Sequence, residues 1–381
     1  MSDKYDEYTI RDIAKMSGLS IASISRYFNG LKVRPGTAQK IKDTLQSIDY
    51  KPNIAAKFMK GQRTGVIGLI VPEISHPFFA LITEGVIAEA RKNDQLILIS
   101  SSYGSRENEI IAIDQFSRSI LDGLIYIPVS NPQNIPAIES FRNIPLVIAA
   151  RSNIFPNVPH VYSDNEKGGY LATKYLINQN RRNIAFLGSF WEIPSNVQDI
   201  RSMTKTALAG SYSTVSRFIG YLHALEEASI PYNPDKVILC GYSYQNGFDA
   251  ARTIMAKLSD IDGLVVMTST VAHGAINAFR AQGFSVPETI SIIVFDDDEI
   301  MYTSLPHFTS VQLSLKQMGM EAVKSLNRVI TNNPCSDTII DVKLKIGDST
   351  VLKDKPTEAL TSTAPQSTTT TKDGGLKMYG L

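Results

Sequence analysis

The segment TIRDIAKMSGLSIASISRYFN, residues 9–29, is predicted to begin with a short amphipathic helix. Ile10, Ile13 and Ala14 recur at the i, i+3, i+4 spacing that places apolar side chains on one helix face. Gly18 follows, and glycine accepts the left-handed conformation that ends a helix. The pattern therefore predicts one helix of about two turns that stops at a tight turn.

A second helix is predicted from Ile21 to Phe28. Ser20 suits its N-cap, because a serine oxygen accepts a hydrogen bond from the free N–H groups of the first turn. Ile24 and Phe28 fall on one side of this helix. Two helices this short and this close have to cross steeply, which indicates a helix-turn-helix. On spacing alone, an ordinary small helical hairpin remains an alternative.

A third helix and a short Ala-rich segment follow the pair. Thr37 is a candidate cap for a helix that carries Ile41, Leu45 and Ile48, and residues 49–52 (DYKP) close it. Residues 53–60 (NIAAKFMK) are too few for a helix that is stable in water by itself. We expect this segment to fold only when DNA and a second subunit support it.

From Thr64 the pattern changes to apolar runs that alternate with amphipathic helices. Runs such as VIGLIV (66–71) and GLIYIPV (123–129) are continuous rather than alternating. Continuous apolar strands between helices predict a parallel sheet covered on both faces. The units are too many for one ordinary sheet, so we expect two similar α/β lobes with a cleft between them.

Charge separates the N-terminal part of the chain from the rest. The whole chain carries a net charge of +1. Residues 1–63 hold 12 Lys/Arg against 6 Asp/Glu, whereas the remainder holds 26 against 31. A basic module on an acidic body is typical of a head that binds a polyanion, although a charge excess can also be a solvated face.

Other features of composition narrow the class of protein. The presence of only 2 cysteines in 381 residues argues against a disulfide scaffold and fits a reducing cytoplasm. The apolar runs are far shorter than the ~20 residues of a membrane span, and the charged N-terminus MSDKYDEY is unlike a secretion signal. We therefore expect a cytoplasmic protein, which would associate with the nucleoid if its basic head binds DNA.

Motifs for catalysis and metal binding are missing from the sequence. It contains no G-x-S-x-G elbow, Walker loop or H-E-x-x-H, and its 5 histidines are scattered. The run from Asp296 to Glu299 is acidic, but no further ligand accompanies it at the spacing of a metal site. We expect no enzymatic activity, no cofactor and no metal.

An ordered set of motifs gives the chain a specific resemblance. TIRDIA, SGLS, ISRYFNG, the turn Tyr50-x-Pro52-Asn53, the short helix after it and IGLIVPEISHPFF follow one another. Together they resemble the lac-repressor (LacI/GalR) family of bacterial transcription regulators, over about residues 8–352. The resemblance implies a two-lobed, periplasmic-binding-protein-like core that the chain crosses three times, near Tyr162-Ser163, Ser310-Val311 and Ile339.

The expected domains follow from pattern and resemblance together. They are a helix-turn-helix domain at 8–52, a hinge helix and linker at 53–63, an effector-binding and dimerisation domain at 64–355 (N-lobe about 64–162 and 311–338, C-lobe about 163–310 and 339–355) and a disordered tail at 356–381. The stretch 189–216 is longer than the usual connection of the family and is expected to be a loop or an added short helix. The Ser/Thr-rich tail lacks the leucine heptads that build tetramers in some relatives.

Three residues of the second helix are candidates for reading bases. Ile21, Ala22 and Arg26 lie on its outward face, where the resemblance places the base-reading positions. Arg26 can donate two hydrogen bonds to guanine, and the two apolar residues can contact a thymine methyl. The alternative for Arg26 is a phosphate contact. The expected phosphate anchors are Thr9, Ser20, Ser23, Ser25 and Asn29.

The hinge segment carries a second set of candidates. Ala56 and Met59 match the positions that relatives insert into the minor groove, although the wedge is commonly leucine. Methionine is among the apolar side chains that separate base steps and kink DNA. Lys57 is expected to approach the phosphates or the groove wall.

The cleft holds the candidate effector site. The resemblance implies that Arg217 and Asp296 face the cleft. A guanidinium and a carboxylate can each bind two neighbouring hydroxyls of a sugar. The alternative for Asp296 is an N-cap or an ion pair between lobes. The other effector candidates are His76, Phe78, Phe79, Ser213, Tyr242 and Thr268.

Several polar positions of the family's pocket are replaced in this chain. Relatives usually carry Asp at the position of Ala150, an Asn-Asp pair at Thr268-Ser269 and Gln at Leu313. These losses weaken the inference to an ordinary hexose and favour a ligand with more apolar or anionic surface.

The sequence therefore predicts a homodimeric, DNA-binding transcription regulator, a repressor of carbohydrate-utilisation genes. A small sugar-like effector in the cleft would change its affinity for double-stranded operator DNA by moving the hinge helices apart. Two alternatives stay open. One is a regulator that a protein partner controls, and the other is a solute-binding sensor without a role at DNA.

Overall fold

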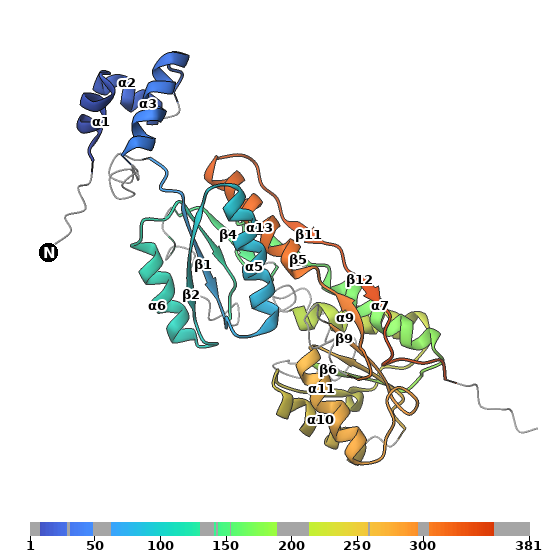
Figure 1. Cartoon of the computed structure of the whole chain (residues 1–381). Coiled ribbons are helices and arrows are strands. Elements are labelled where there is room, and N and C mark those ends of the chain that lie inside the picture. The colour runs from blue at the N-terminus through green and yellow to red at the C-terminus, as the bar shows by residue number, and fades with distance from the viewer. Residues whose placement is uncertain are drawn as a thin grey trace, which may run out of the picture.

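The computed structural model describes residues 8–28, 31–48, 62–129, 141, 144–152, 154–188, 213–257, 260–295 and 305–353. Within these ranges the chain forms a small helical head, followed by two lobes that each surround a six-stranded sheet. In Figure 1 the head lies beside the first lobe, and the second lobe lies at the far end of the molecule.

The head is built as the apolar spacing predicts. Helices α1 (Ile10–Ser17), α2 (Ile21–Phe28) and α3 (Pro35–Ser47) share a core, and Gly18 ends α1 in the left-handed region at φ 65°. The Ser20 hydroxyl accepts the Ser23 N–H at 3.2 Å, so the predicted cap of α2 is present. The buried residues of this core are Ile13, Ala14, Ile24 and Ile41.

One predicted cap is wrong. Thr37 lies inside the first turn of α3, which begins two residues earlier at Pro35 with Arg34 as its N-cap residue. Proline favours the first position of a helix because its fixed φ already suits the helix and its missing N–H would have no partner there. The proline, rather than the threonine hydroxyl, therefore sets the start of α3.

The prediction of parallel sheets in two lobes is confirmed. The first sheet has the order β11-β5-β4-β3-β1-β2 and is parallel throughout, and the second has the order β12-β10-β9-β8-β6-β7 with only β12 antiparallel. The strands of the first sheet are β1 (Val66–Val71), β2 (Leu96–Ser101), β3 (Gly123–Tyr126), β4 (Leu146–Ala149), β5 (His160–Ser163) and β11 (Thr338–Ile340). Those of the second are β6 (Ile184–Gly188), β7 (Val237–Leu239), β8 (Gly263–Val266), β9 (Ser291–Phe295), β10 (Thr309–Gln312) and β12 (Lys343–Lys345).

Helices cover both faces of each sheet, as continuous apolar strands require. The core of the first lobe lies between the sheet and α5 (Pro77–Lys92) with α13 (Leu315–Ile330) on one face, and α6 (Arg106–Ser117) on the other. In the second lobe, α7 (Asn165–Asn178) and α9 (Ser213–Glu227) cover one face, and α10 (Tyr244–Lys257) and α11 (Ser269–Ala281) the other. The short 3-10 helix η3 (Pro234–Lys236) precedes β7.

Each helix pair packs through two glycines that face each other's backbone. A Cβ atom on Gly169 of α7 would lie 1.8 Å from the Arg217 carbonyl oxygen, and one on Gly220 of α9 would lie 1.9 Å from that of Glu166. The same reciprocal contact joins α5 to α13 and α10 to α11. No side chain fits at these crossings, so each pair is held at one close distance and moves as a unit.

The chain passes between the lobes three times, slightly later than expected at two of them. β10 continues to Gln312 in the second sheet, and β11 continues to Ile340 in the first. The crossings therefore follow Ser163, Gln312 and Ile340, because both strands keep their sheet pairing beyond the predicted limits of Ser310-Val311 and Ile339.

Buried Arg181 fastens the end of the described chain to the second lobe. Its guanidinium is 0% exposed and donates to five backbone carbonyls at 3.0–3.3 Å, among them those of Pro287 and Val351. Burial lowers the pKa of Arg181 from its ordinary value, and the nearby Asp262 opposes this shift. Asp262 also binds Lys353 at 2.7 Å, which closes the network.

Candidate DNA-binding and effector sites

Helix α2 presents one face to the core of the head and the other to solvent. Ile24 is fully buried, whereas Ile21 is 51% exposed and Ala22 and Arg26 are also exposed. The Arg26 guanidinium donates one long bond of 3.4 Å to the Lys32 carbonyl. An exposed arginine on the same helix as two exposed apolar side chains has the chemistry that reads a guanine and a thymine in a major groove.

The hydroxyl residues of the head hold its helix ends. Thr9 and Asp12 form a reciprocal capping box, in which the Asp12 carboxylate accepts the Thr9 N–H at 2.8 Å and the Thr9 hydroxyl at 2.6 Å. These bonds lower the pKa of Asp12 below 3.8. Ser20 and Ser23 bond to each other at 2.9 Å. Before any of these hydroxyls can anchor a phosphate, its present hydrogen bond has to be shared.

Several predicted site residues lie outside the described part of the chain. They are Asn29 of the head, Ala56, Lys57 and Met59 of the hinge segment, and Asp296 of the cleft. The described part of the DNA-binding site is therefore the capped ends of α1 and α2. The described part of the effector site centres on the guanidinium of Arg217.

Arg217 lies where the second lobe faces the crossings. It is 5% exposed, and its Nε donates to Asn165 Oδ1 at 2.9 Å while Nη1 donates to the Met267 carbonyl at 3.1 Å. The guanidinium carbon stands 4.3 Å from the centre of the Phe295 ring, at the end of β9. The arginine is thus fixed by an amide, a carbonyl and an aromatic face before any ligand arrives.

Two further candidates, Ser213 and Thr268, lie on the same lobe as Arg217. Ser213 begins α9, and its hydroxyl reaches the Ala150 carbonyl of the first lobe at 3.5 Å. Thr268 follows Met267 and caps α11, accepting the Val271 N–H at 3.3 Å. Ser213 therefore spans the two lobes, while Thr268 uses its oxygen on a helix end.

The aromatic candidates are divided between the lobes. His76 caps α5 through its Nδ1, which accepts the Phe78 N–H at 3.2 Å, and its ring lies 5.5 Å from that of Phe79. Phe78 and Phe79 meet edge to face at 5.1 Å. Tyr242 of the second lobe is 47% exposed, just before the start of α10 at Tyr244.

The positions where polar residues are replaced are closed to solvent. Ala150 and Leu313 are 3% and 1% exposed, and both belong to a core cluster that runs through both lobes. Ala150 has the left-handed φ of 59°. Apolar packing therefore occupies these positions on the side of the first lobe.

Sequence patterns did not single out two residues that the structure places at critical points. Asn165 bonds to Arg217 and to the Ser163 carbonyl, both at 2.9 Å. Asp122 accepts three hydrogen bonds of 2.8–2.9 Å from Thr64 and Gly65 at the start of the first lobe. Asn165 comes shortly after the end of β5, and Asp122 directly precedes β3. This position next to a strand was the only feature of the sequence that could have pointed to either residue.

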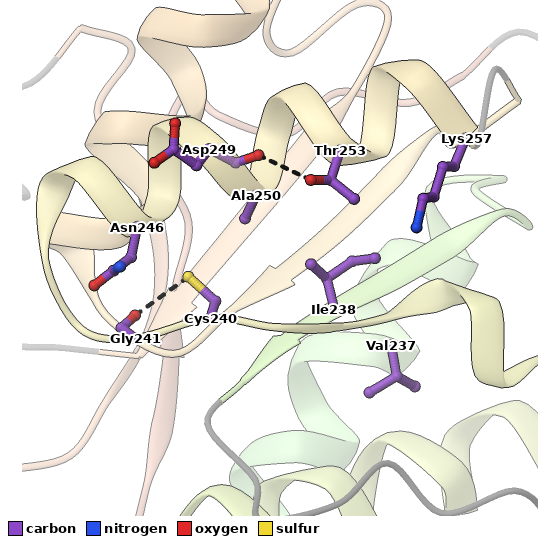
Figure 2. A pocket seen from close by; sticks show the side chains of 9 residues that line it. All are labelled: Val237, Ile238, Cys240, Gly241, Asn246, Asp249, Ala250, Thr253 and Lys257. Atoms are coloured by element: carbon purple, nitrogen blue, oxygen red, sulfur yellow. Dashed lines mark hydrogen bonds between the residues drawn. The ribbon is translucent and has the colours of Figure 1, made fainter.

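A separate hollow lies on the second lobe between β7 and α10 (Figure 2). It has a volume of about 380 Å³, with Val237 and Ile238 on the strand side and Asn246, Asp249 and Lys257 along the helix. The Cys240 thiol at its end donates to the Gly241 carbonyl at 3.2 Å, and burial raises the pKa of this thiol to about 11. The thiol is therefore protonated at neutral pH and unreactive.

The described residues hold neither a metal cluster nor a membrane-spanning helix. Among these residues, no group of three or more His, Cys, Asp or Glu is placed to hold a metal ion. None of the helices in the described part of the chain is long and apolar enough to cross a membrane.

Comparison with known proteins agrees with this geometry. Residues 64–347 match the family model of periplasmic binding proteins and the sugar binding domain of the LacI family. The HTH-type transcriptional regulator RegA of Clostridium saccharobutylicum is 28% identical over 84% of this chain and 92% of its own length. Catabolite control protein A of Priestia megaterium is 26% identical over 89% and 97%. The lac repressor dimer, solved on its operator with the anti-inducer ONPF, shares the fold with a TM-score of 0.73 at 19% identity, over 91% of this chain and 100% of its own.

Fold and comparisons together define the class as a helix-turn-helix head on a two-lobed, periplasmic-binding-protein-like core. The chain belongs to the LacI family of transcription regulators.

Proposed function

We propose that the protein is a homodimeric repressor that binds operator DNA with its head and is controlled by a small effector between its lobes. The observation that carries the proposal is the division of α2, which buries Ile24 and exposes Ile21, Ala22 and Arg26 on the opposite side. The lac repressor, which shares the fold, was solved as a dimer on operator DNA. Cytoplasmic location follows from this role.

An exposed apolar edge supports the dimer. Leu96 and Leu98 of the edge strand β2 are 61% and 44% exposed, and Ile87 of the neighbouring α5 is 37% exposed. An uncovered apolar edge strand invites pairing with other chains, so proteins usually cover it. We propose that a second copy covers this edge and thereby places two heads on two half-sites of the operator.

The effector class follows from the walls of the cleft. The second lobe offers Arg217 with its amide and aromatic supports, whereas the side of the first lobe is apolar at Ala150 and Leu313, which are buried. A ligand that presents oxygens or an anionic group to Arg217 and an apolar side to the first lobe fits this asymmetry better than a plain hexose. The same apolar side keeps control by a protein partner as the second candidate.

The DNA role is tested by selecting duplexes from a random-sequence pool with the full-length protein. Arg26→Ala should then cost about 1–3 kcal/mol on the selected duplex and relax the choice at one base pair of each half-site. Binding to unrelated DNA should barely change. An equal loss on both kinds of DNA would make Arg26 a phosphate contact, and failure to enrich any sequence would refute the proposal.

The effector role is tested by calorimetry with sugars, sugar phosphates and nucleosides. Arg217→Ala should abolish the response to whichever compound binds while leaving DNA binding intact, which would make a permanent repressor. Tight binding of unmodified glucose or galactose would contradict the argument from the apolar side of the first lobe. No binding across the whole panel would favour control by a protein partner.

A further inference from the structure

We propose that Asn165 and Arg63 are positioning residues at the two ends of a bonded relay, which carries the state of the effector cleft to the linker that enters the DNA-binding part of the chain. The inference rests on the proposed function, because it explains how one site of the regulator acts on the other. It assigns roles to two residues that lie outside the predicted DNA-reading and effector-binding sets.

The relay begins at the amide of Asn165. Its Oδ1 accepts the Nε–H of Arg217 at 2.9 Å, and its Nδ2 donates to the Ser163 carbonyl at 2.9 Å. The side chain thus uses its acceptor on the cleft and its donor on the backbone of the first crossing. A ligand that pulls the guanidinium of Arg217 has to strain or release this amide.

The first turn of α7 is where the three crossings meet. Ser163 Oγ donates to the Leu313 carbonyl at 2.9 Å, and the Asp164 N–H donates to the Ile340 carbonyl at 2.9 Å. Lys167 pairs with Asp341 of the third crossing. We call residues 163–167, 313–314 and 340–341 the crossover junction. Because all three connections pass through it, any change of the angle between the lobes has to bend the chain there.

Helix α13 leads from the crossover junction to the linker. It begins at Leu315, directly after Ser314, which holds the left-handed φ of 54°. With 16 residues it is about 24 Å long at 1.5 Å per residue. The reciprocal glycine contact of Gly85 and Gly319 fixes it against α5, so a displacement at one end is not absorbed by sliding between the two helices.

The far end of α13 is bonded to the linker. Arg63 Nη2 donates to the Ile330 carbonyl at 3.2 Å. Carbonyls in the last turn of a helix lack a partner within the helix and carry partial negative charge, so a guanidinium is a favourable donor there. Asp122 holds the next residues through the Thr64 and Gly65 N–H groups at 2.8 Å, which keeps Arg63 at this helix end.

A double-mutant cycle on DNA affinity tests the relay. Asn165→Asp keeps the acceptor for Arg217 but loses the donor to Ser163, and Arg63→Met keeps the side-chain stem but loses the donor to Ile330. Dissociation constants of the full-length proteins are measured by fluorescence anisotropy on the duplex selected with the wild type. Changes at distant, independent sites multiply, so we expect the double variant to depart from the product of the single effects by about threefold or more.

Matched controls separate the relay from charge and stability. Asn180→Asp loses an equivalent amide-to-carbonyl bond, to Lys353, and adds the same charge, while Arg118→Met removes an exposed arginine of the first lobe. Their cycle should be multiplicative. If the cycle of Asn165 and Arg63 is multiplicative as well, the proposal is overturned.

Hydrogen exchange supplies a readout that needs neither DNA nor effector. In the free full-length protein, Asn165→Asp should raise exchange in the peptide that covers residues 62–66, far from the substitution. Ser163→Ala, which removes only the bond to Leu313, should do the same and replaces Asn165→Asp if that variant does not fold. Faster exchange confined to residues 313–318 would overturn the relay, whereas a wild type that selects no duplex would refute only the proposed function.

Discussion

The head and the two-lobed body are held together in different ways. The head has a core of four buried residues, Ile13, Ala14, Ile24 and Ile41, and its helix ends are closed by side chains such as Thr9 and Ser20. The body surrounds two six-stranded sheets, and one of its core clusters runs through both lobes. Substitution of one core residue is therefore enough to unfold the head. The body is strongly destabilised only by the loss of a residue that bonds several segments of the chain.

The difference also separates the work of the two regions. The head exposes the proposed base-reading side chains, Ile21, Ala22 and Arg26, on the short helix α2. The body buries Arg217 and bonds it to Asn165, which couples this arginine to a separate segment of the chain. Substitutions that act on one region and spare the other can test this division.

The largest effect is expected for Arg181→Ala in the body. The variant removes the donor of five carbonyl bonds at once. The carbonyls of Asp262 and Pro287 keep a second donor in Ser291, so the loss stays well below five full penalties of about 1–3 kcal/mol. We expect the body to lose about 3–5 kcal/mol in urea unfolding. Hydrogen exchange in residues 10–28 should stay unchanged, because the head folds on its own core.

The neighbouring arginine provides the control for this prediction. Arg182 is exposed, and its guanidinium makes one long bond of 3.4 Å to the Ile177 carbonyl. Arg182→Ala should therefore change the free energy of unfolding by less than about 0.5 kcal/mol. If Arg181→Ala and Arg182→Ala lower the free energy of unfolding equally, the carbonyl bonds of Arg181 add nothing to the stability of the body.

The second effect, Ile24→Ala, reverses the comparison. Removing a fully buried isoleucine costs about 2–4 kcal/mol, which is a large share of the stability of so small a core. We expect the head to unfold and DNA binding to disappear while the thermal transition of the body stays in place. The control is Ile21→Ala, which changes a 51% exposed position and should leave the head folded. If Ile24→Ala still binds DNA, then either the head does not depend on this core or DNA binds elsewhere.

The same division explains which features the sequence predicts. In the head, neighbours in sequence are neighbours in space, so the spacing of Ile10, Ile13 and Ile24 was enough to predict two helices and their buried sides. The cap at Thr37 was wrong because Pro35, two residues away, fixes the backbone more strongly than a hydroxyl does.

In the body, continuous apolar runs predicted the strands, their number predicted two lobes, and family resemblance supplied the three crossings between the lobes. The partners of a site residue were a different matter, because Arg217, Asn165 and Met267 come from three separate segments. No periodicity relates residues 52 and 50 positions apart, so only folding reveals that they bond.

A third, smaller effect compares a glycine of each region. Gly169 of the body has no room for a methyl group, since its Cβ would lie 1.8 Å from the Arg217 carbonyl oxygen. Gly169→Ala should cost about 1–3 kcal/mol and lower the affinity for whichever effector binds at Arg217. Gly36 in the head has open space around it, so Gly36→Ala should stabilise the head by about 0.4–1 kcal/mol. Thermal unfolding of the two variants measures the change in stability of each region. Equal destabilisation by the two substitutions would contradict the prediction.

As pH falls, the body should lose stability at a higher pH than the head. Burial lowers the pKa of His160 below 6.5, although Asp337, 3.2 Å from its Nδ1, opposes this shift. Its Nε2 accepts the Ile154 N–H at 3.3 Å, so the folded ring is neutral. In the head, the hydrogen bonds from Thr9 lower the pKa of Asp12 below 3.8.

The two shifts place the losses in different windows of pH. The unfolded His160 takes up a proton near pH 6.5 and the folded one only at lower pH, so the body loses stability as pH falls from 6.5 toward the folded pKa. The contribution of Asp12 is present above pH 3.8 and is lost as pH falls through its lowered pKa. Thermal unfolding between pH 7 and 5 should therefore shift the body, and His160→Gln should flatten that part of the profile. Titration of the His160 ring by NMR checks the cause, and a pKa at or above 6.5 would contradict it.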